Sequence, residues 1–201
     1  AIDRMKPRYT RKQQAAKTKM HILHCAIDLL CKNMITSLSV DDICKAAEVS
    51  VGSFYHYFPS KEDIFWESYK EFDTELQDLW EKQQFSKPRE AIQFLIMQQF
   101  YAQITKGALF TSQFFAYQLS LPTEKKALVR ESFFFFKQLK EEVTKLLEDN
   151  GSNESASVIT NDILRSTRGA LYDWALRNGS YDLFAVGLKH LQMVLNFYGL
   201  V

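Results

Sequence analysis

The sequence predicts an all-α fold. Only seven glycines and four prolines interrupt the 201 residues, so positions that break helices are sparse. Apolar residues recur at spacings of three and four, and no alternating segment rich in valine or threonine indicates a strand. Hydrophobic residues make up 46% of the chain, which at this length is enough to build a substantial buried core.

We expect about nine helices, and capping or helix-breaking residues mark most of their ends. Ser39 and Ser50 are of the type that caps helix N-termini, and Pro88 suits a first helical turn. Gly151 and Gly179 each follow an asparagine and are typical of the position just after a helix. The expected helices cover residues 12–32, 39–47, 50–58, 61–83, 88–105, 109–119, 122–149, 154–177 and 180–198.

The segment from Ser39 to Glu62 predicts two short helices joined by a tight turn, followed by the start of a third. Asp42 lies three residues after Ser39, where a carboxylate can complete a capping box. Phe54 and Phe58 lie one helical turn apart, so both can point inward from the second short helix. This spacing is that of a helix-turn-helix, although ordinary helical proteins also contain it.

The outer face of the second short helix carries small or hydrogen-bonding residues. They are Gly52, Ser53, Tyr55, His56 and Tyr57, with Lys61 shortly after the helix end. Hydroxyl, imidazole and ammonium groups can donate to phosphate oxygens, and a helix presented by its N-terminus fits a major groove. The pattern therefore indicates a DNA-reading helix. The alternative is a pair of amphipathic core helices with incidental polar residues outside.

This segment resembles the signature of TetR-type transcriptional regulators. The matching positions are Ser39, Val40, Ile43, Ala46, Ala47, Val49, Ser50, Gly52, Phe54, Tyr55, Tyr57, Phe58 and Lys61. Two departures are Glu48, where the family commonly has glycine, and Asp41, an acidic residue on a helix that usually lies near the DNA backbone.

The resemblance implies a helix-turn-helix domain over residues 1–62 and a helical effector-binding and dimerisation domain over residues 63–201. It implies a homodimer that binds a palindromic operator in double-stranded DNA, most often as a repressor that a small-molecule effector releases. The residues it places at the DNA are Ser39, Ser50, Val51, Gly52, Ser53, Tyr55, His56, Tyr57 and Lys61, with Val51 near base edges and Ser39 and Lys61 at the phosphate backbone.

Charge is distributed unevenly along the chain. Residues 1–62 contain ten Lys/Arg and six Asp/Glu, whereas the remaining residues contain fifteen and eighteen. Seven of the basic side chains fall within the first 19 residues. We expect this basic arm to be disordered without a partner and to increase DNA affinity by releasing counterions.

The second part of the chain contains more aromatic residues than one packed layer needs. Four consecutive phenylalanines, 133–136, would sweep about 300° of a helix and could not share one core face. Together with the resemblance, this excess indicates a pocket for an apolar or aromatic effector. The expected lining is Met97, Phe100, Tyr101, Ile104, Phe114, Tyr117, Phe133, Phe136, Tyr172 and Trp174.

The last two helices each carry two apolar faces, one for the chain's own core and one for a second subunit. A monomer in which both helices are central is the alternative. The resemblance implies a dimer through these helices, and the expected interface is Ile159, Ile163, Ala170, Val186, His190, Val194 and Phe197.

Other functional classes find little support in the sequence. Three cysteines in predicted helices indicate a reducing, cytoplasmic setting, and no apolar run approaches the ~18 residues of a membrane span. No phosphate loop, nucleophile elbow or convincing metal-ligand spacing occurs, so we expect no enzyme activity, cofactor or metal. A helical ligand-binding protein or enzyme without a DNA role is the remaining alternative.

Overall fold

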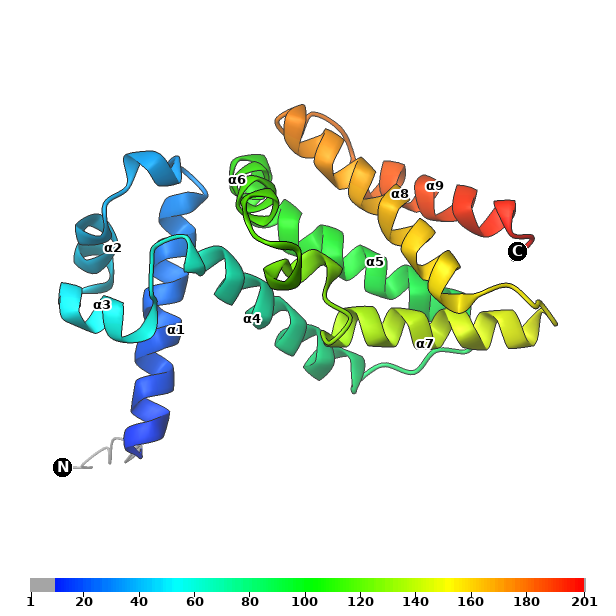
Figure 1. Ribbon diagram of the computed structural model, residues 1–201, viewed down its shortest axis with the longest axis horizontal. Helices are drawn as coiled ribbons and strands as arrows, with labels where there is room; N and C mark the ends of the chain where they lie inside the picture. Colours follow the sequence, from blue (N-terminus) through cyan, green and yellow to red (C-terminus); the bar gives the residue numbers. More distant parts are fainter. Residues whose placement is uncertain (1–9, 201) are drawn as a thin grey trace, which may run out of the picture. The chain divides into compact units, whose positions relative to one another are not determined.

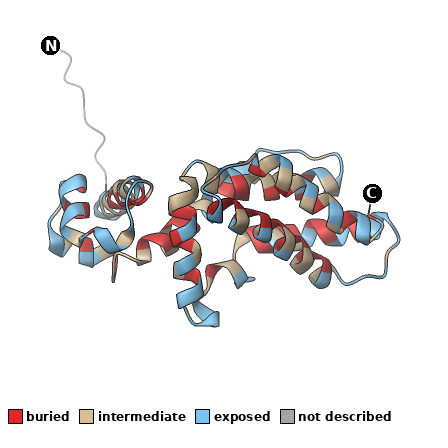
Figure 2. Ribbon diagram, turned by 90° about the horizontal axis from the view of Figure 1, so that it is seen from above, coloured by how far each residue is buried: buried red, intermediate tan, exposed pale blue. Residues whose placement is uncertain are grey.

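The computed structural model describes residues 10–200, and these residues form α-helices joined by turns and short 3₁₀ segments (Figure 1). The prediction of an all-α fold is confirmed. The chain divides into two compact units, one ending at Ile64 and the other beginning at Phe65. Each unit has its own buried interior (Figure 2). The start of the predicted basic arm, residues 1–9, lies outside the described residues.

The first unit is a three-helix domain. Its elements are α1 (Arg11–Leu30), η1 (Ile35–Ser37), α2 (Val40–Ala47) and α3 (Val51–Tyr57), followed by the start of α4 (Asp63–Trp80). Thr10 and Gln13 form a capping box that begins α1. Apolar side chains from every α-helix meet in one core, in which Ile22, Ile43 and Phe54 are at most 1% exposed.

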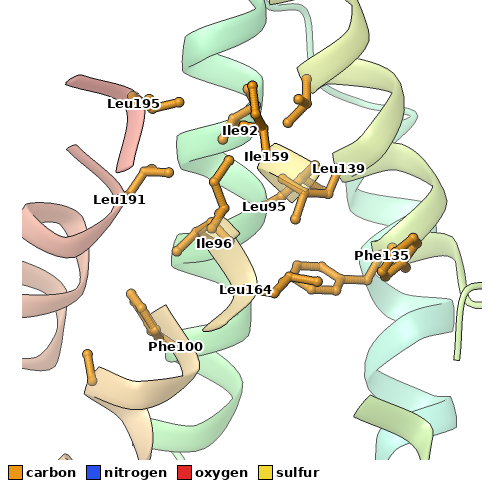
Figure 3. Close-up of a cluster of buried hydrophobic side chains, with 14 of the residues drawn as sticks. Ile92, Leu95, Ile96, Phe100, Phe135, Leu139, Ile159, Leu164, Leu191 and Leu195 are labelled. Atoms are coloured by element: carbon orange, nitrogen blue, oxygen red, sulfur yellow. The ribbon is translucent and has the colours of Figure 1, made fainter. Parts of the chain in front are cut away.

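The second unit is a helical bundle. It contains the rest of α4 and the helices α5 (Pro88–Ile104), α6 (Gly107–Ser120), α7 (Phe134–Asp149), α8 (Ala156–Leu176) and α9 (Leu183–Phe197). Figure 3 shows that α5, α7, α8 and α9 all contribute side chains to its core, with Leu95, Leu139, Ile159 and Leu191 among them. Gly151 and Gly179 adopt positive φ after α7 and α8, as helix-ending glycines do.

The prediction of one helix over residues 122–149 is wrong. Residues Thr123–Lys125 and Ala127–Val129 form 3₁₀ turns, and α7 begins only at Phe134. The side chain of Asp73, on α4, accepts hydrogen bonds from the backbone N–H groups of Phe134 and Phe135, each at 2.8 Å. A tertiary cap therefore fixes the start of α7, and burial raises the pKa of the Asp73 carboxyl.

The later start of α7 changes the interpretation of the four phenylalanines. Phe133 lies before the helix in extended backbone, so the four do not share one helical sweep. Phe135 and Phe136 enter the core, and Phe133 and Phe134 are partly buried against aromatic rings of α4. None of the four is exposed, and the run by itself does not require a pocket.

Along the described part of the chain, none of the helices is long and apolar enough to cross a membrane.

Candidate DNA interface and effector site

The start of α2 is fixed by a reciprocal cap. The Ser39 backbone N–H donates to Asp42 Oδ2 at 2.8 Å, and the Asp42 N–H donates to Ser39 Oγ at 3.1 Å. The Ser39 hydroxyl also donates to the same carboxylate, and these hydrogen bonds lower the pKa of Asp42. Asp42 is therefore committed to holding α2 in place, as the sequence predicted.

The turn between α2 and α3 is built on Glu48. This residue adopts the left-handed conformation, with φ 54° and ψ 42°, where glycine is the usual choice. A side chain at such a position costs about 1 kcal/mol. Because the Val49 N–H still donates to the Cys44 carbonyl at 3.0 Å, the helix end keeps its normal closing hydrogen bond.

Helix α3 is held by its inner face. Ser50 caps it by accepting from the Ser53 N–H at 3.1 Å. Phe54 and Phe58 are both 0% exposed, and their rings stack with centroids 5.3 Å apart. A helix of only two turns is marginal by itself, so this buried pair of rings is what keeps α3 rigid.

The opposite face of α3 is open. Tyr55 is 54% and Val51 40% exposed, although both are large apolar or aromatic side chains. Gly52 and His56 are also exposed, whereas Tyr57 is partly buried, with its ring edge-on to His56. Four of the residues expected at DNA, Val51, Gly52, Tyr55 and His56, thus share one exposed face of α3.

Lys61 is engaged inside the first unit. Its ammonium donates to the carbonyl oxygens of Ile35 and Leu38, at 2.7 and 2.6 Å. These carbonyls belong to the turn that leads into the Ser39 cap, so Lys61 ties the residues after α3 to the residues before α2. We revise its expected role from a phosphate contact to a positioning residue for α2.

Replacing Lys61 by methionine is expected to lower the free energy of unfolding of the first unit by about 1.5–3 kcal/mol, the usual range for hydrogen bonds to a charged group. Thermal unfolding followed by circular dichroism measures this change. Lys45→Met, at a largely exposed lysine on α2, is the matched control and should unfold like the parent chain. Equal stability of the two variants would contradict the positioning role.

The residues expected to line the effector pocket do not gather in one place. A cavity of about 140 Å³ lies among α4, α5 and the turn before α6, and of the ten expected residues it contains Tyr101 alone. Its lining is Glu71, Phe72, Glu75, Leu76, Leu79, Gln98, Tyr101, Ala102, Thr105 and Lys106. The α4 residues were missed, although the apolar side of that helix was visible in the sequence.

The other expected lining residues fall into two groups. Phe100, Phe136 and Trp174 are core residues, and Met97 and Ile104 are partly buried on α5. The second group consists of Phe114, Tyr117, Phe133 and Tyr172, whose rings contact other aromatic rings of the second unit. Phe114 and Phe133 contact Tyr69, Tyr117 contacts Phe65, and Tyr172 contacts Phe115.

Several expected interface residues are unavailable to a second subunit. Ile159 and Ile163 are 0% exposed and Ala170 is 4% exposed, because the chain's own core covers them. Their assignment to an interface is wrong: the apolar face of α8 that carries them points inward. On α9, Phe197 is 83% exposed, whereas His190 is partly buried, with its Nδ1 3.1 Å from Ser166 Oγ. Val186 and Val194 are also partly buried.

Most of the first unit lies within a match to a known protein family. Residues 22–67 match the family described as bacterial regulatory proteins, tetR family. The chain is 32% identical over 84 residues to the HTH-type transcriptional regulator AcrR of Shigella flexneri. That alignment covers 42% of this chain and 39% of the relative, so the match spans about two fifths of the curated protein.

Solved structures share the fold over nearly the whole chain. FadR of Bacillus subtilis, solved in complex with stearoyl-CoA, superposes with a TM-score of 0.57 at 18% identity, covering 90% of this chain and 98% of that one. PfmR of Thermus thermophilus, a TetR family transcriptional regulator, gives 0.63 at 21% identity, covering 87% and 97%. At these identities the likeness shows a common fold.

Proposed function

The chain belongs to the TetR family through its N-terminal domain, and from this premise we propose that it is a transcriptional repressor that binds a palindromic operator as a homodimer and is released by a small molecule. The observation that carries the proposal is α3. It is a short helix anchored by two fully buried phenylalanines, and its outer face exposes Val51, Gly52, Tyr55 and His56.

The chemistry of this face suits a duplex. Tyr55 and His56 can donate hydrogen bonds to phosphate oxygens, and Val51 can contact a thymine methyl group at a base edge. Gly52 lets the start of the helix approach closely, because it presents no side chain. The cap residues Ser39 and Ser50 lie at the N-termini of α2 and α3, where helix dipoles favour phosphate.

A selection from random double-stranded DNA tests the proposal without knowledge of the operator. The recovered sequences should share a palindrome, and the observed affinity should fall with salt with a log–log slope of about −0.9 per phosphate contact. Tyr55→Ala should weaken binding about tenfold. Leu119→Ala, at an exposed side chain on α6 of the second unit, is the control and should bind DNA unchanged.

A chain that enriches no sequence, and in which Tyr55→Ala changes nothing, would instead be a helical ligand-binding protein or enzyme without a DNA role.

The dimer part of the proposal is supported by exposed apolar side chains on α9. Met193 is 56% and Phe197 83% exposed, which is unusual for side chains of this size. They border a groove of about 360 Å³ that also includes Val194 of α9, Tyr198 just after α9, and Arg165 of α8. We place the interface on this surface in place of the buried positions Ile159 and Ile163.

Phe197→Arg is expected to shift the chain from dimer to monomer, because it places a charge at the most exposed apolar position of this surface. Light scattering after size-exclusion chromatography gives the mass directly. Leu119→Arg introduces the same charge at a 70% exposed leucine on α6 and should leave the mass unchanged. A Phe197→Arg variant that stays dimeric would remove the interface from this groove.

The effector part depends on α4, which begins in the first unit and continues into the second. A small molecule bound in the second unit that shifts α4 would alter how the two copies of α3 meet DNA. A coupling free energy of about 1–3 kcal/mol between the two sites is enough for a usable switch.

A further inference from the structure

Helix α8 carries one arginine whose charge has no partner. Arg165 pairs with Asp162, and Arg177 pairs with Asp173, each within one helical turn. Arg168, between them, makes no ion pair with any carboxylate in the part of the chain that the structure describes, and its buried Nε has no hydrogen-bond partner. Among the described residues Arg168 is therefore unpaired, whereas the arginines on either side of it on α8 are each paired with an aspartate.

The surroundings of Arg168 do not neutralise the guanidinium. Burial lowers its pKa, and the only charge effect on it comes from the phenol of Tyr69. Burial raises the pKa of Tyr69 to about 12, so the phenol is uncharged near neutral pH. A buried cation without a counter-ion is costly, and a site that retains one generally uses it.

Aromatic rings surround the Tyr69 side of this site. Tyr69 stacks on Phe114, with centroids 6.1 Å apart, and meets Phe133 edge-on at 4.9 Å. On α8, Tyr172 follows Arg168 by one turn and contacts Phe115 at 5.7 Å. An apolar wall and an uncompensated cation thus lie together in the second unit. Arg168 as a whole is partly exposed, whereas its Nε is buried.

We propose that Arg168 binds the acidic group of the effector, and that the effector is an amphipathic anion with a carboxylate or phosphate group on an apolar body. A guanidinium offers a planar set of N–H donors that matches both groups, and the rings offer the surface for the apolar body. This inference rests on the proposed function in taking the ligand to be an effector. It narrows the apolar or aromatic effector expected from the sequence to an acidic one.

Ligand binding to the full-length chain without DNA tests the inference. The probes are dodecanoate, dodecanol and dodecyltrimethylammonium, which share one alkyl chain and differ in charge, each used below its micelle concentration. Titration calorimetry should give an affinity for dodecanoate at least about tenfold above that for dodecanol, with the cation weakest. Equal affinity for the acid and the alcohol, or no binding of dodecanoate, would overturn the proposal.

Arg168→Met should abolish the preference for dodecanoate over dodecanol without weakening dodecanol. The matched control Arg177→Met, on the same helix but exposed and paired, should keep the preference. The melting temperature of Arg168→Met should equal or exceed that of the parent, because the variant removes an unpaired buried charge. A lower melting temperature with an unchanged preference would assign Arg168 to structure and overturn its role as a ligand contact.

Because ligand binding is measured without DNA, its outcome does not depend on the outcome of the operator selection. A chain that prefers dodecanoate but enriches no DNA sequence would keep the anion site and lose the proposed function. A chain that selects a palindrome but shows no preference for the acid would keep the proposed function and lose the anion site.

Discussion

Gly52→Ala is expected to weaken DNA binding at least about tenfold while the folded chain stays as stable as the parent or becomes more stable. A Cβ built at Gly52 would meet only Ser50 Oγ, at 3.8 Å, which is ordinary van der Waals contact. Alanine also favours a helical backbone over glycine by up to about 1 kcal/mol. Nothing in the described chain therefore requires glycine here, so the expected loss would arise at the proposed contact with DNA.

Fluorescence anisotropy with the selected operator measures the affinity, and circular dichroism measures the melting temperature. Gly169→Ala is the matched control, because Gly169 also lies on a helix and a Cβ there would meet nothing within 4 Å. That variant should gain stability and keep its DNA affinity. If Gly52→Ala bound DNA as tightly as the parent, close approach of α3 to the duplex would be disproved.

Gly187→Ala is expected to destabilise the second unit, by about 1–3 kcal/mol or more, as overpacked cores do. A Cβ at Gly187, on α9, would lie 2.0 Å from Cε2 and 2.3 Å from Cζ of Phe100. Phe100 lies on α5 and is 0% exposed, so its ring has no free space into which to move. Glycine is therefore what lets α9 pack closely against α5.

Urea unfolding monitored by tryptophan fluorescence follows this unit, because all three tryptophans belong to it. The double variant Gly187→Ala, Phe100→Leu supplies the control, since a smaller side chain opposite the new methyl group should recover part of the loss. If the losses of stability in Gly187→Ala and Phe100→Leu simply added in the double variant, the contact between Gly187 and Phe100 would not explain the effect of Gly187→Ala.

The first unit could be predicted from the sequence because its signals are local. Ser39 and Asp42 form a cap within four residues, and Phe54 and Phe58 lie on one helical face. Glu48 stands where the family commonly has glycine, and its φ of 54° is one that glycine adopts most easily. Such features depend on neighbours in sequence, so a single chain reveals them.

What the sequence could not reveal depends on partners distant in the chain. The start of α7 is set by Asp73, about 60 residues earlier, and Lys61 is committed to carbonyls more than 20 residues before it. Which apolar face of α8 is buried depends on the packing of other helices, and two apolar faces look alike in sequence. Arg168 stands out only after the partners of Arg165 and Arg177 are known.

The Asp73 cap has a mechanical consequence. One carboxylate of α4 holds two amides at the start of α7, so a slide of α4 along α7 by even a fraction of a turn would break both bonds at once. We therefore expect α4 and the start of α7 to move together for as long as both hydrogen bonds hold. A ligand that shifts α4 should then either carry the start of α7 with it or break both hydrogen bonds.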